Sequence, residues 1–285
     1  MTSRFLPLDC IRGFLGVLSA LFLLFSSPLA HSEEPPPTQS NPLAASTSLE
    51  LEKMTWLEVR DRIQAGARRV IIPTGGIEQS GPFVALNKHD LIAREVSVRS
   101  ARILGDTLVA PTVSFVPEGE VSPPTGHMRF SGTISVKPAT LQILLEDVAS
   151  SLAAHGFTEI ILVGDSGDTQ ATLLTTANTL SASTKLSAKV RYLPQFYNYS
   201  DVDDFLARKG IKTGTEEFHE DAAVSLQLLV IDPDAMRYQE RMRIGRTKLD
   251  GLSLENREAL VALGKEILSL RAERVAEAIR GEPKR

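Results

Sequence analysis

Three loops of the sequence carry side chains that could do chemistry, and each loop follows a strand-like apolar run. Glu78 lies in "IIPTGGIEQSGP", directly after a run of buried character, and His127 lies in the Pro/Gly-rich segment that follows "TLVAPTVSF". Asp165 and Asp168 lie in "GDSGDTQ", after the apolar run "EIILV". Because parallel sheets place their chemistry outside the carboxyl ends of the strands, we expect these loops to meet at one edge.

Further candidate side chains occur near these loops. His89 and Asp90 follow Glu78 within "EQSGPFVALNKHD", and His219 opens the stretch "HEDAAVS". A fourth histidine, His155, ends an expected helix, where a cation offsets the helix dipole, so we assign it a structural role. Because three histidines lie in or near such loops, we interpret them as members of one functional site and not as isolated surface residues.

Glutamate, aspartate and histidine side chains that converge at strand ends offer hard oxygen and nitrogen donors. Such donors suit Zn²⁺ or Mn²⁺, which acidifies water for hydrolysis. The same side chains could instead act as general acids and bases without a metal. Their spacing does not separate the two possibilities, because the donors come from different loops.

The stretch "GDSGD" also allows a serine-hydrolase hypothesis with Ser166 as nucleophile. A nucleophile elbow would read G-x-S-x-G, whereas the last position here is Asp168. Pairing of Ser166 with His219 stays open, because catalytic triads are defined by geometry and not by order in the chain.

Alternating helical and strand-like patterns predict the elements that position these loops. Strands alternating with helices imply a mainly parallel sheet covered on both faces. The fold class that we predict is α/β, a three-layer sandwich with a mainly parallel central sheet flanked by helices. The expected strands are 68–76, 107–115, 159–165 and 188–194, and the expected helices are 55–66, 90–105, 138–156, 169–183, 219–231 and 253–280.

Composition and charge exclude one class of function. The chain has 285 residues, 42% of them hydrophobic and 23% charged, which is ordinary for a globular protein with a sizeable core. Its net charge of −4 gives no sign of a nucleic-acid partner or of an anionic membrane surface. We therefore expect a small-molecule substrate or ligand, no nucleic acid and no membrane contact beyond the N-terminus.

The N-terminus has the pattern of a secretory signal peptide. Basic residues precede an apolar run at 14–25, and "SSPLAHSEE" follows with a small-x-small site, so we expect cleavage after Ser32. The chain is then exported, to the periplasm or beyond. The only cysteine, Cys10, falls in the removed segment, so the mature protein has no thiol.

The remaining sequence divides at a change of composition. Residues 1–32 are the expected signal peptide, and residues 33–50 are rich in Pro, Ser and Thr and are predicted to form a flexible linker. Residues 51–285 are predicted to form a single α/β domain that ends in one long helix.

Several blocks of the sequence resemble the creatininase family of metal-dependent amidohydrolases. "TWLEV", "PTGGIEQSGP", "FSGTIS" after His127, "HGF" and "GDSGDT" match that family's motifs in order, and "HEDAAVS" aligns with a late block. The resemblance extends from about Met54 to Arg243 and implies an α/β amidohydrolase that assembles as a homo-oligomer.

The resemblance also implies a metal site, with departures. Two histidine ligands of the family align with Ser80 and Ser166, and a bridging aspartate aligns with His89. Because serine is a poor zinc ligand, we expect at most one divalent ion, Zn or Mn, per chain. The implied ligands are Glu78, His89 and Asp168, with Asp90 and Asp165 as further candidates, and the implied catalytic residues are Asp168, His219 and His127.

Three functions follow as hypotheses. The first is an exported metal-dependent hydrolase that cleaves an amide or cyclic amide C–N bond. The second is a non-catalytic periplasmic protein that binds a small molecule on the same scaffold. The third is a metal-free serine hydrolase that uses Ser166.

Overall fold

A four-stranded parallel sheet forms the centre of the computed structural model, which describes residues 38–214 and 219–281. The predicted signal peptide, 1–32, lies outside the described residues. A compact unit comprises Asn41–Arg285. The sheet order is β2-β1-β3-β4, with bounds of Thr107–Val109, Arg69–Thr74, Glu159–Gly164 and Lys189–Tyr192 respectively.

The two central strands are apolar at consecutive positions because both faces of the sheet are covered. β1 and β3 pair in parallel register, with Ile71 opposite Ile161. Ile71 and Ile161 pack into the core on one face, whereas Val70 and Ile160 pack into the core on the other. All four side chains are fully buried.

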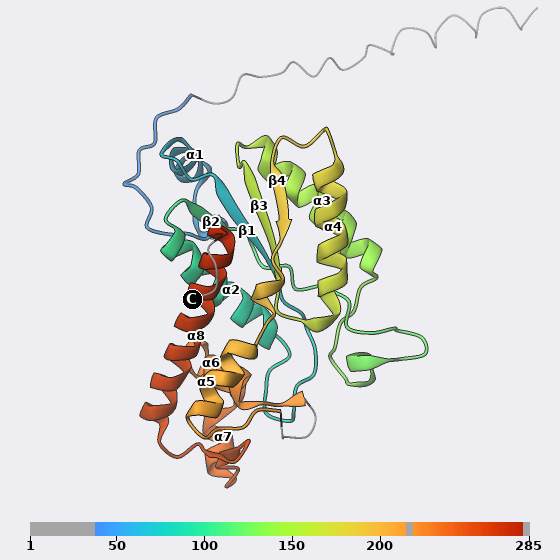
Figure 1. Ribbon diagram of the computed structural model, residues 1–285, viewed down its shortest axis with the longest axis vertical. Coiled ribbons are helices and arrows are strands. Elements are labelled where there is room, and N and C mark those ends of the chain that lie inside the picture. Colours follow the sequence, from blue (N-terminus) through green and yellow to red (C-terminus); the bar gives the residue numbers. More distant parts are fainter. Residues whose placement is uncertain (1–37, 215–218, 282–285) are drawn as a thin grey trace, which may run out of the picture. The chain divides into compact units, whose positions relative to one another are not determined.

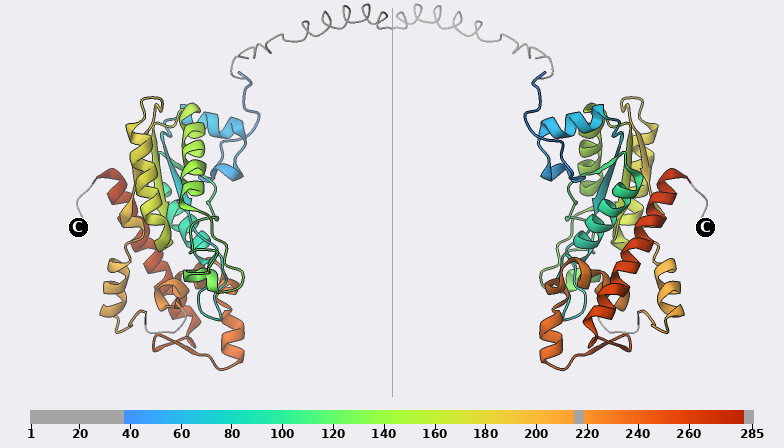
Figure 2. Two further views of the ribbon diagram at one scale, coloured as in Figure 1. Left: turned by 90° about the vertical axis from the view of Figure 1, so that its right-hand side faces the viewer. Right: turned by 90° about the vertical axis from the view of Figure 1, so that its left-hand side faces the viewer.

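Helices cover both faces of this sheet (Figures 1 and 2). α3 (Pro138–Ala154) and α4 (Gln170–Ala182) lie on one face. α2 (Lys88–Leu104) and α8 (Arg257–Arg280) lie on the other, with α6 (Ala222–Ile231) packed against both. The predicted three-layer α/β fold with a mainly parallel central sheet is therefore confirmed.

Most predicted elements occur close to their expected bounds. α1 (Trp56–Gln64) starts at the predicted cap, where the Thr55 side chain accepts a hydrogen bond from the Glu58 backbone. β2 is shorter than predicted, because Pro111 cannot donate to a neighbouring strand. The chain returns to the sheet at Val113, which forms an isolated bridge to Thr74.

Some short elements were not predicted. These elements are α5 (Ser200–Arg208), α7 (Tyr238–Arg243), β5 (Lys248–Leu249) and β6 (Leu252–Ser253). Six residues of helix and a hairpin of two-residue strands are too brief for a reliable hydrophobic period, whereas α5 is amphipathic and was missed.

The end of the predicted linker contacts the α/β unit. The Asn41 side chain donates to Asp61 on α1, and the backbone oxygen of Leu49 accepts a hydrogen bond from Val109. Residues 41–50 therefore belong with the sheet in the compact unit.

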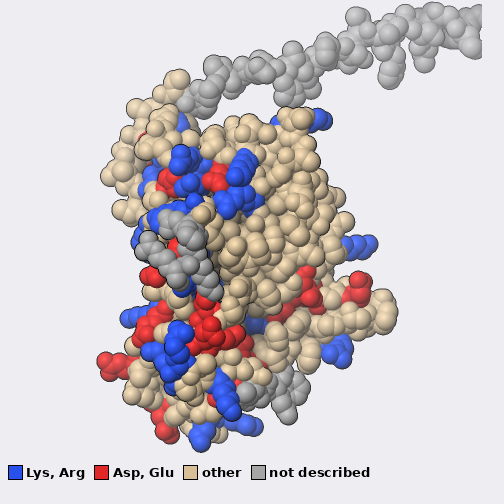
Figure 3. Space-filling model, viewed as in Figure 1, with Lys and Arg blue, Asp and Glu red and all other residues tan. Residues whose placement is uncertain are grey.

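The surface over α4 is almost free of charged side chains (Figure 3). The sequence of α4, "QATLLTTANTLSA", contains no acidic or basic residue, and Leu174 is 48% exposed. Within the described part of the chain, no helix is both long and apolar enough to cross a membrane.

Candidate metal centre

The loop after β1 brings Glu78 to the carboxyl end of the sheet, as the sequence predicts. Two glycines allow this loop to pass between two acidic side chains. A Cβ atom on Gly75 would lie 2.0 Å from Oδ1 of Asp90, and one on Gly76 would lie 2.2 Å from Oε1 of Glu118. Any larger side chain at either position would displace the loop that carries Glu78.

The Glu78 carboxylate is buried, with its side chain 3% exposed, and is surrounded by nitrogen atoms. Lys88 Nζ lies 2.6 Å and His89 Nε2 2.7 Å from Oε1. His127 Nε2 lies 3.3 Å from Oε2, and His219 Nε2 lies 3.8 Å from Oε1. Burial alone would raise the pKa of Glu78, but hydrogen bonds from His89 and Glu118 and the Lys88 charge outweigh it and lower the pKa. Glu78 is therefore an anion at neutral pH.

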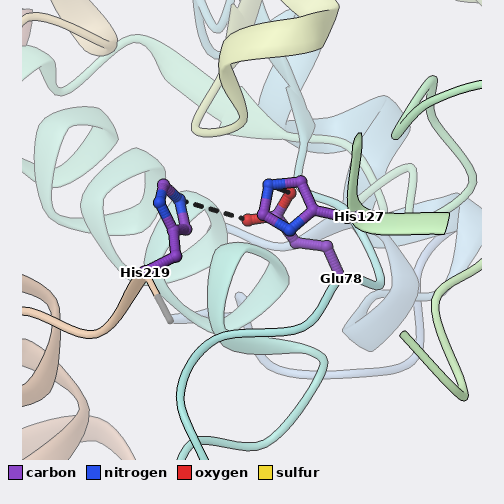
Figure 4. Close-up of side chains that lie close together, drawn as sticks. All are labelled: Glu78, His127 and His219. Atoms are coloured by element: carbon purple, nitrogen blue, oxygen red, sulfur yellow. Dashed lines mark ion pairs between the residues drawn. The ribbon is translucent and has the colours of Figure 1, made fainter. Parts of the chain in front are cut away.

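Glu78, His127 and His219 form a group with the geometry of a metal site. One donor atom of each residue lies within 4.8 Å of the others. Both imidazoles approach the Glu78 carboxylate (Figure 4), and their ring centroids are 5.0 Å apart. A carboxylate with two imidazoles is a donor set of catalytic zinc sites. The His219 side chain is 60% exposed, so the group is open to solvent on that side.

The backbone conformation of His219 and a hydrogen bond to its carbonyl fix the position of this residue. It has a φ angle of 63°, and its carbonyl oxygen accepts a hydrogen bond from the hydroxyl of Ser80. Desolvation and the nearby Lys88 ammonium lower the pKa of His219, so a neutral imidazole with a free lone pair is available near pH 7. Ser80, which occupies a position of the predicted metal-ligand loop, thus orients His219.

His89 joins Glu78 to a second buried ion pair. Its Nε2 contacts Glu78, and its Nδ1 lies 2.8 Å from Oδ2 of Asp165. Burial opposes the imidazolium form, but the two carboxylates outweigh burial and raise the pKa of His89. Oδ1 of Asp165 lies 2.7 Å from Nη2 of Arg271 on α8, so a chain of contacts crosses the site from Glu78 to Arg271.

Glu118 is a second carboxyl group beside Glu78. It is fully buried, and Oε2 accepts a hydrogen bond of 3.3 Å from the Ser166 hydroxyl. Burial and the adjacent Glu78 carboxylate raise the pKa of Glu118 to about 10. The proton of this carboxyl pair is therefore expected on Glu118 at neutral pH, which leaves the negative charge on Glu78.

A cavity of about 320 Å³ adjoins this cluster. Its lining includes Lys88, His89, Asp165, Tyr197 and His219. A second cavity of about 340 Å³, lined mainly by residues of α5 and α8, includes none of the Glu78, His127 and His219 group. Of the Glu78, His127 and His219 group, His219 lines the first cavity, so this cavity meets the site on the His219 side.

The other predicted ligands occupy different surroundings. The Asp90 carboxylate accepts a hydrogen bond from the Gly76 backbone and so fixes the loop. Asp168 is exposed on the short turn Gly167–Thr169, and its charge raises the pKa values of Glu118 and Tyr197. Asp165 is bonded to His89, Arg271 and Tyr199. Since both ring nitrogens of His89 already contact carboxylates, the geometry favours His127 and His219 over His89 as the histidines that would bind a metal together with Glu78. The metal roles proposed for His89 and Asp168 remain predictions.

Sequence reasoning missed three residues of this cluster. Lys88 and Arg271 were not predicted because lysine and arginine are usually exposed. Glu118 was not predicted because it lies in a Pro/Gly-rich segment without periodicity. One available signal was the adjacency of Lys88 to His89 at the start of a helix that follows the Glu78 loop.

A family model described as Creatininase, creatinine amidohydrolase, matches residues 52–279. Among curated proteins, the chain is 30% identical over 118 residues to a creatinine amidohydrolase of Pseudomonas putida, and the aligned segment covers 41% of this chain. It is 28% identical over 134 residues to a mycofactocin precursor peptide peptidase of Mycolicibacterium smegmatis, which covers 45% of this chain. The matched segments span 45% and 47% of these relatives, about half of their length.

Solved structures show the same fold. A crystal structure of creatinine amidohydrolase (creatininase) superposes with a TM-score of 0.65 at 22% identity and covers 84% of this chain and 100% of its own. A Zn-Zn type and a Mn form of creatininase each have a TM-score of 0.61 and 23% identity, and each covers 98% of its own chain and 83% and 82% of this one, respectively.

Proposed function

The chain belongs to the creatininase family, and from this premise we propose that it is a metal-dependent amidohydrolase acting on a C–N bond of a small amide. The observation that carries the proposal is the convergence of Glu78, His127 and His219 at the carboxyl end of the sheet. The relatives named creatinine amidohydrolase support the reaction class.

The residues present fit one divalent ion. Oxygen of Glu78 and Nε2 of His127 and His219 would hold it, and this donor set favours zinc. A bound ion would supply a Lewis acid toward water and the amide carbonyl. Nδ1 of His127 is buried and has no hydrogen-bond partner among the described residues, so no acceptor fixes its ring. We therefore propose weak binding, because second-sphere hydrogen bonds normally strengthen metal sites.

The surrounding residues prepare the site for hydrolysis. A proton on Glu118 leaves the negative charge of this carboxyl pair on Glu78. Asp168 is exposed beside this pair, and we propose that it positions a water molecule for attack. The cavity of about 320 Å³ accommodates a small cyclic or linear amide.

We expect at most one zinc ion per chain after dialysis of the purified protein. His219→Ala and His127→Ala should each weaken zinc binding by about tenfold or more, because each removes one of three donors. The measurements are metal content by mass spectrometry and zinc affinity by competition with a chromogenic chelator.

His155→Ala is the matched control, since His155 is exposed at the end of α3, outside the metal group. It should leave zinc affinity unchanged. Two tightly held ions per chain, or unchanged affinity in both His127→Ala and His219→Ala, would contradict the assigned ligands.

We also propose export with removal of residues 1–32. A basic start, an apolar run and a small-x-small site support the proposal. Mass spectrometry of protein from the periplasm or medium should show a mature chain that begins near Glu33. An intact Met1 would contradict cleavage, and a product confined to the cytosol would contradict export.

A second candidate function is small-molecule binding without turnover. The observation that favours it is the contact of Lys88 and His89 with Oε1 of Glu78. These contacts reduce the negative charge that the carboxylate can offer to a metal. Under this function, zinc-loaded protein hydrolyses no member of a panel of lactams, cyclic imides and linear amides. A ligand from the same panel would still raise the melting temperature.

The serine hydrolase has less support than either of these functions. The Ser166 hydroxyl donates to Glu118, and within the described residues no hydrogen bond joins Ser166 to a histidine that could activate it.

A further inference from the structure

Lys88 is a buried cation that the proposed reaction does not use. It is the first residue of α2, and its side chain is 1% exposed. Lysine is almost never fully buried unless it is paired. Its ammonium group lies 2.6 Å from Oε1 of Glu78, which is itself 3% exposed. The two charges therefore meet in an environment with little water, where their interaction is strong.

The charges around Glu78 are balanced before any metal binds. Glu78 and Asp165 supply two carboxylates, while Lys88 and Arg271 supply two cations and His89, when protonated, a third within one chain of contacts. A dication that binds beside Glu78 must do so next to a carboxylate whose charge is already compensated. Coulomb repulsion from Lys88 then opposes it.

The two oxygens of Glu78 have different neighbours. Oε1 contacts Lys88 Nζ and His89 Nε2 and lies 3.8 Å from His219 Nε2, whereas Oε2 is the oxygen nearest His127 Nε2. Lys88 thus contacts the oxygen on the His219 side of the carboxylate, and a metal held with His127 and His219 would lie near this ammonium group. Lys88 and the metal compete for the charge of one side chain.

We propose that Lys88 is a built-in counter-cation of Glu78 that sets the metal affinity of the group Glu78, His127 and His219. The inference rests on the proposed metal site and specifies its control. Lys88 keeps the Glu78 carboxylate neutralised when no metal is present, and it keeps the affinity for a divalent ion low.

The test compares zinc binding of the full chain with that of Lys88→Met and Lys88→Arg, by calorimetry and chelator competition. Methionine keeps the length of the side chain and removes the charge, whereas arginine keeps the charge. Lys88→Met should bind zinc about tenfold tighter or more, a change as large as the losses that follow replacement of residues supporting metal ligands. Lys88→Arg should stay within about twofold of the wild type. Equal or weaker zinc binding by Lys88→Met would overturn the inference.

Thermal unfolding shows whether Lys88→Met is folded and supplies a second readout. Without zinc, Lys88→Met should melt at a lower temperature than the wild type, because Glu78 loses its compensating charge. Zinc should raise its melting temperature more than that of the wild type. The double variant Glu78→Gln/Lys88→Met removes both charges and should regain stability but not zinc binding. A double variant as unstable as Lys88→Met would contradict the pairing.

The outcomes separate this inference from the proposed function. If the wild type binds no zinc but Lys88→Met does, the inference holds and the native metal site fails. If all variants bind zinc equally, the metal site stands and the role of Lys88 is wrong. If none binds zinc, both are overturned.

Discussion

Glu78→Gln is expected to abolish zinc binding and to lower amide hydrolysis by about a hundredfold or more, about 2.7 kcal/mol of transition-state stabilisation. Glutamine keeps the shape of the side chain but removes the negative charge that His127 and His219 share with a metal. The measurement is kcat/KM of wild type and variant, each assayed with added zinc on the best amide substrate from the panel, together with zinc content after dialysis.

Ser166→Ala is the matched control for Glu78→Gln. Ser166 is buried in the same cluster and donates to Glu118, but it contacts no predicted metal ligand by a described hydrogen bond. Its loss should change kcat/KM by less than about tenfold, the effect of one neutral hydrogen bond. A larger loss in Ser166→Ala than in Glu78→Gln, with activity that survives chelators, would support the serine hydrolase instead.

Arg271→Met is expected to destabilise the protein by about 3–5 kcal/mol, because it leaves a buried charge without its partner. Arg271 donates to Asp165 Oδ1, Tyr199 Oη, Gln227 Oε1 and the Phe196 carbonyl. Asp165 is fully buried, and its pKa is lowered because Arg271 and His89 outweigh the effect of burial. The measurement is the midpoint of unfolding in guanidinium chloride.

Arg274→Met on the same helix is the control. Arg274 is 27% exposed and pairs with Asp201 and Glu277 near the surface, so its loss should cost less than about 1 kcal/mol. The double variant Asp165→Asn/Arg271→Met should regain part of the lost stability, since it removes both buried charges. Equal destabilisation by Arg271→Met and Arg274→Met would show that the buried ion pair contributes little.

The sequence by itself determined the layers of the fold and the place of the site. Hydrophobic periodicity is a local property, so the apolar run of β1 and the amphipathic pattern of α8 could be recognised without partners. Parallel strands end at one edge of a sheet, and Glu78 and Asp165 each follow such a strand. Their neighbourhood was therefore predictable from order in the chain alone.

Only the tertiary structure decided which side chains share the Glu78 carboxylate. His127 and His219 reach it from separate loops, whereas His89, the histidine nearest in sequence, contacts Glu78 with one ring nitrogen and Asp165 with the other. Burial of the first turn of α2 turned Lys88 from an expected surface residue into the partner of Glu78. Such pairings depend on distances between segments far apart in the chain, and spacing along the sequence carries no information about those distances.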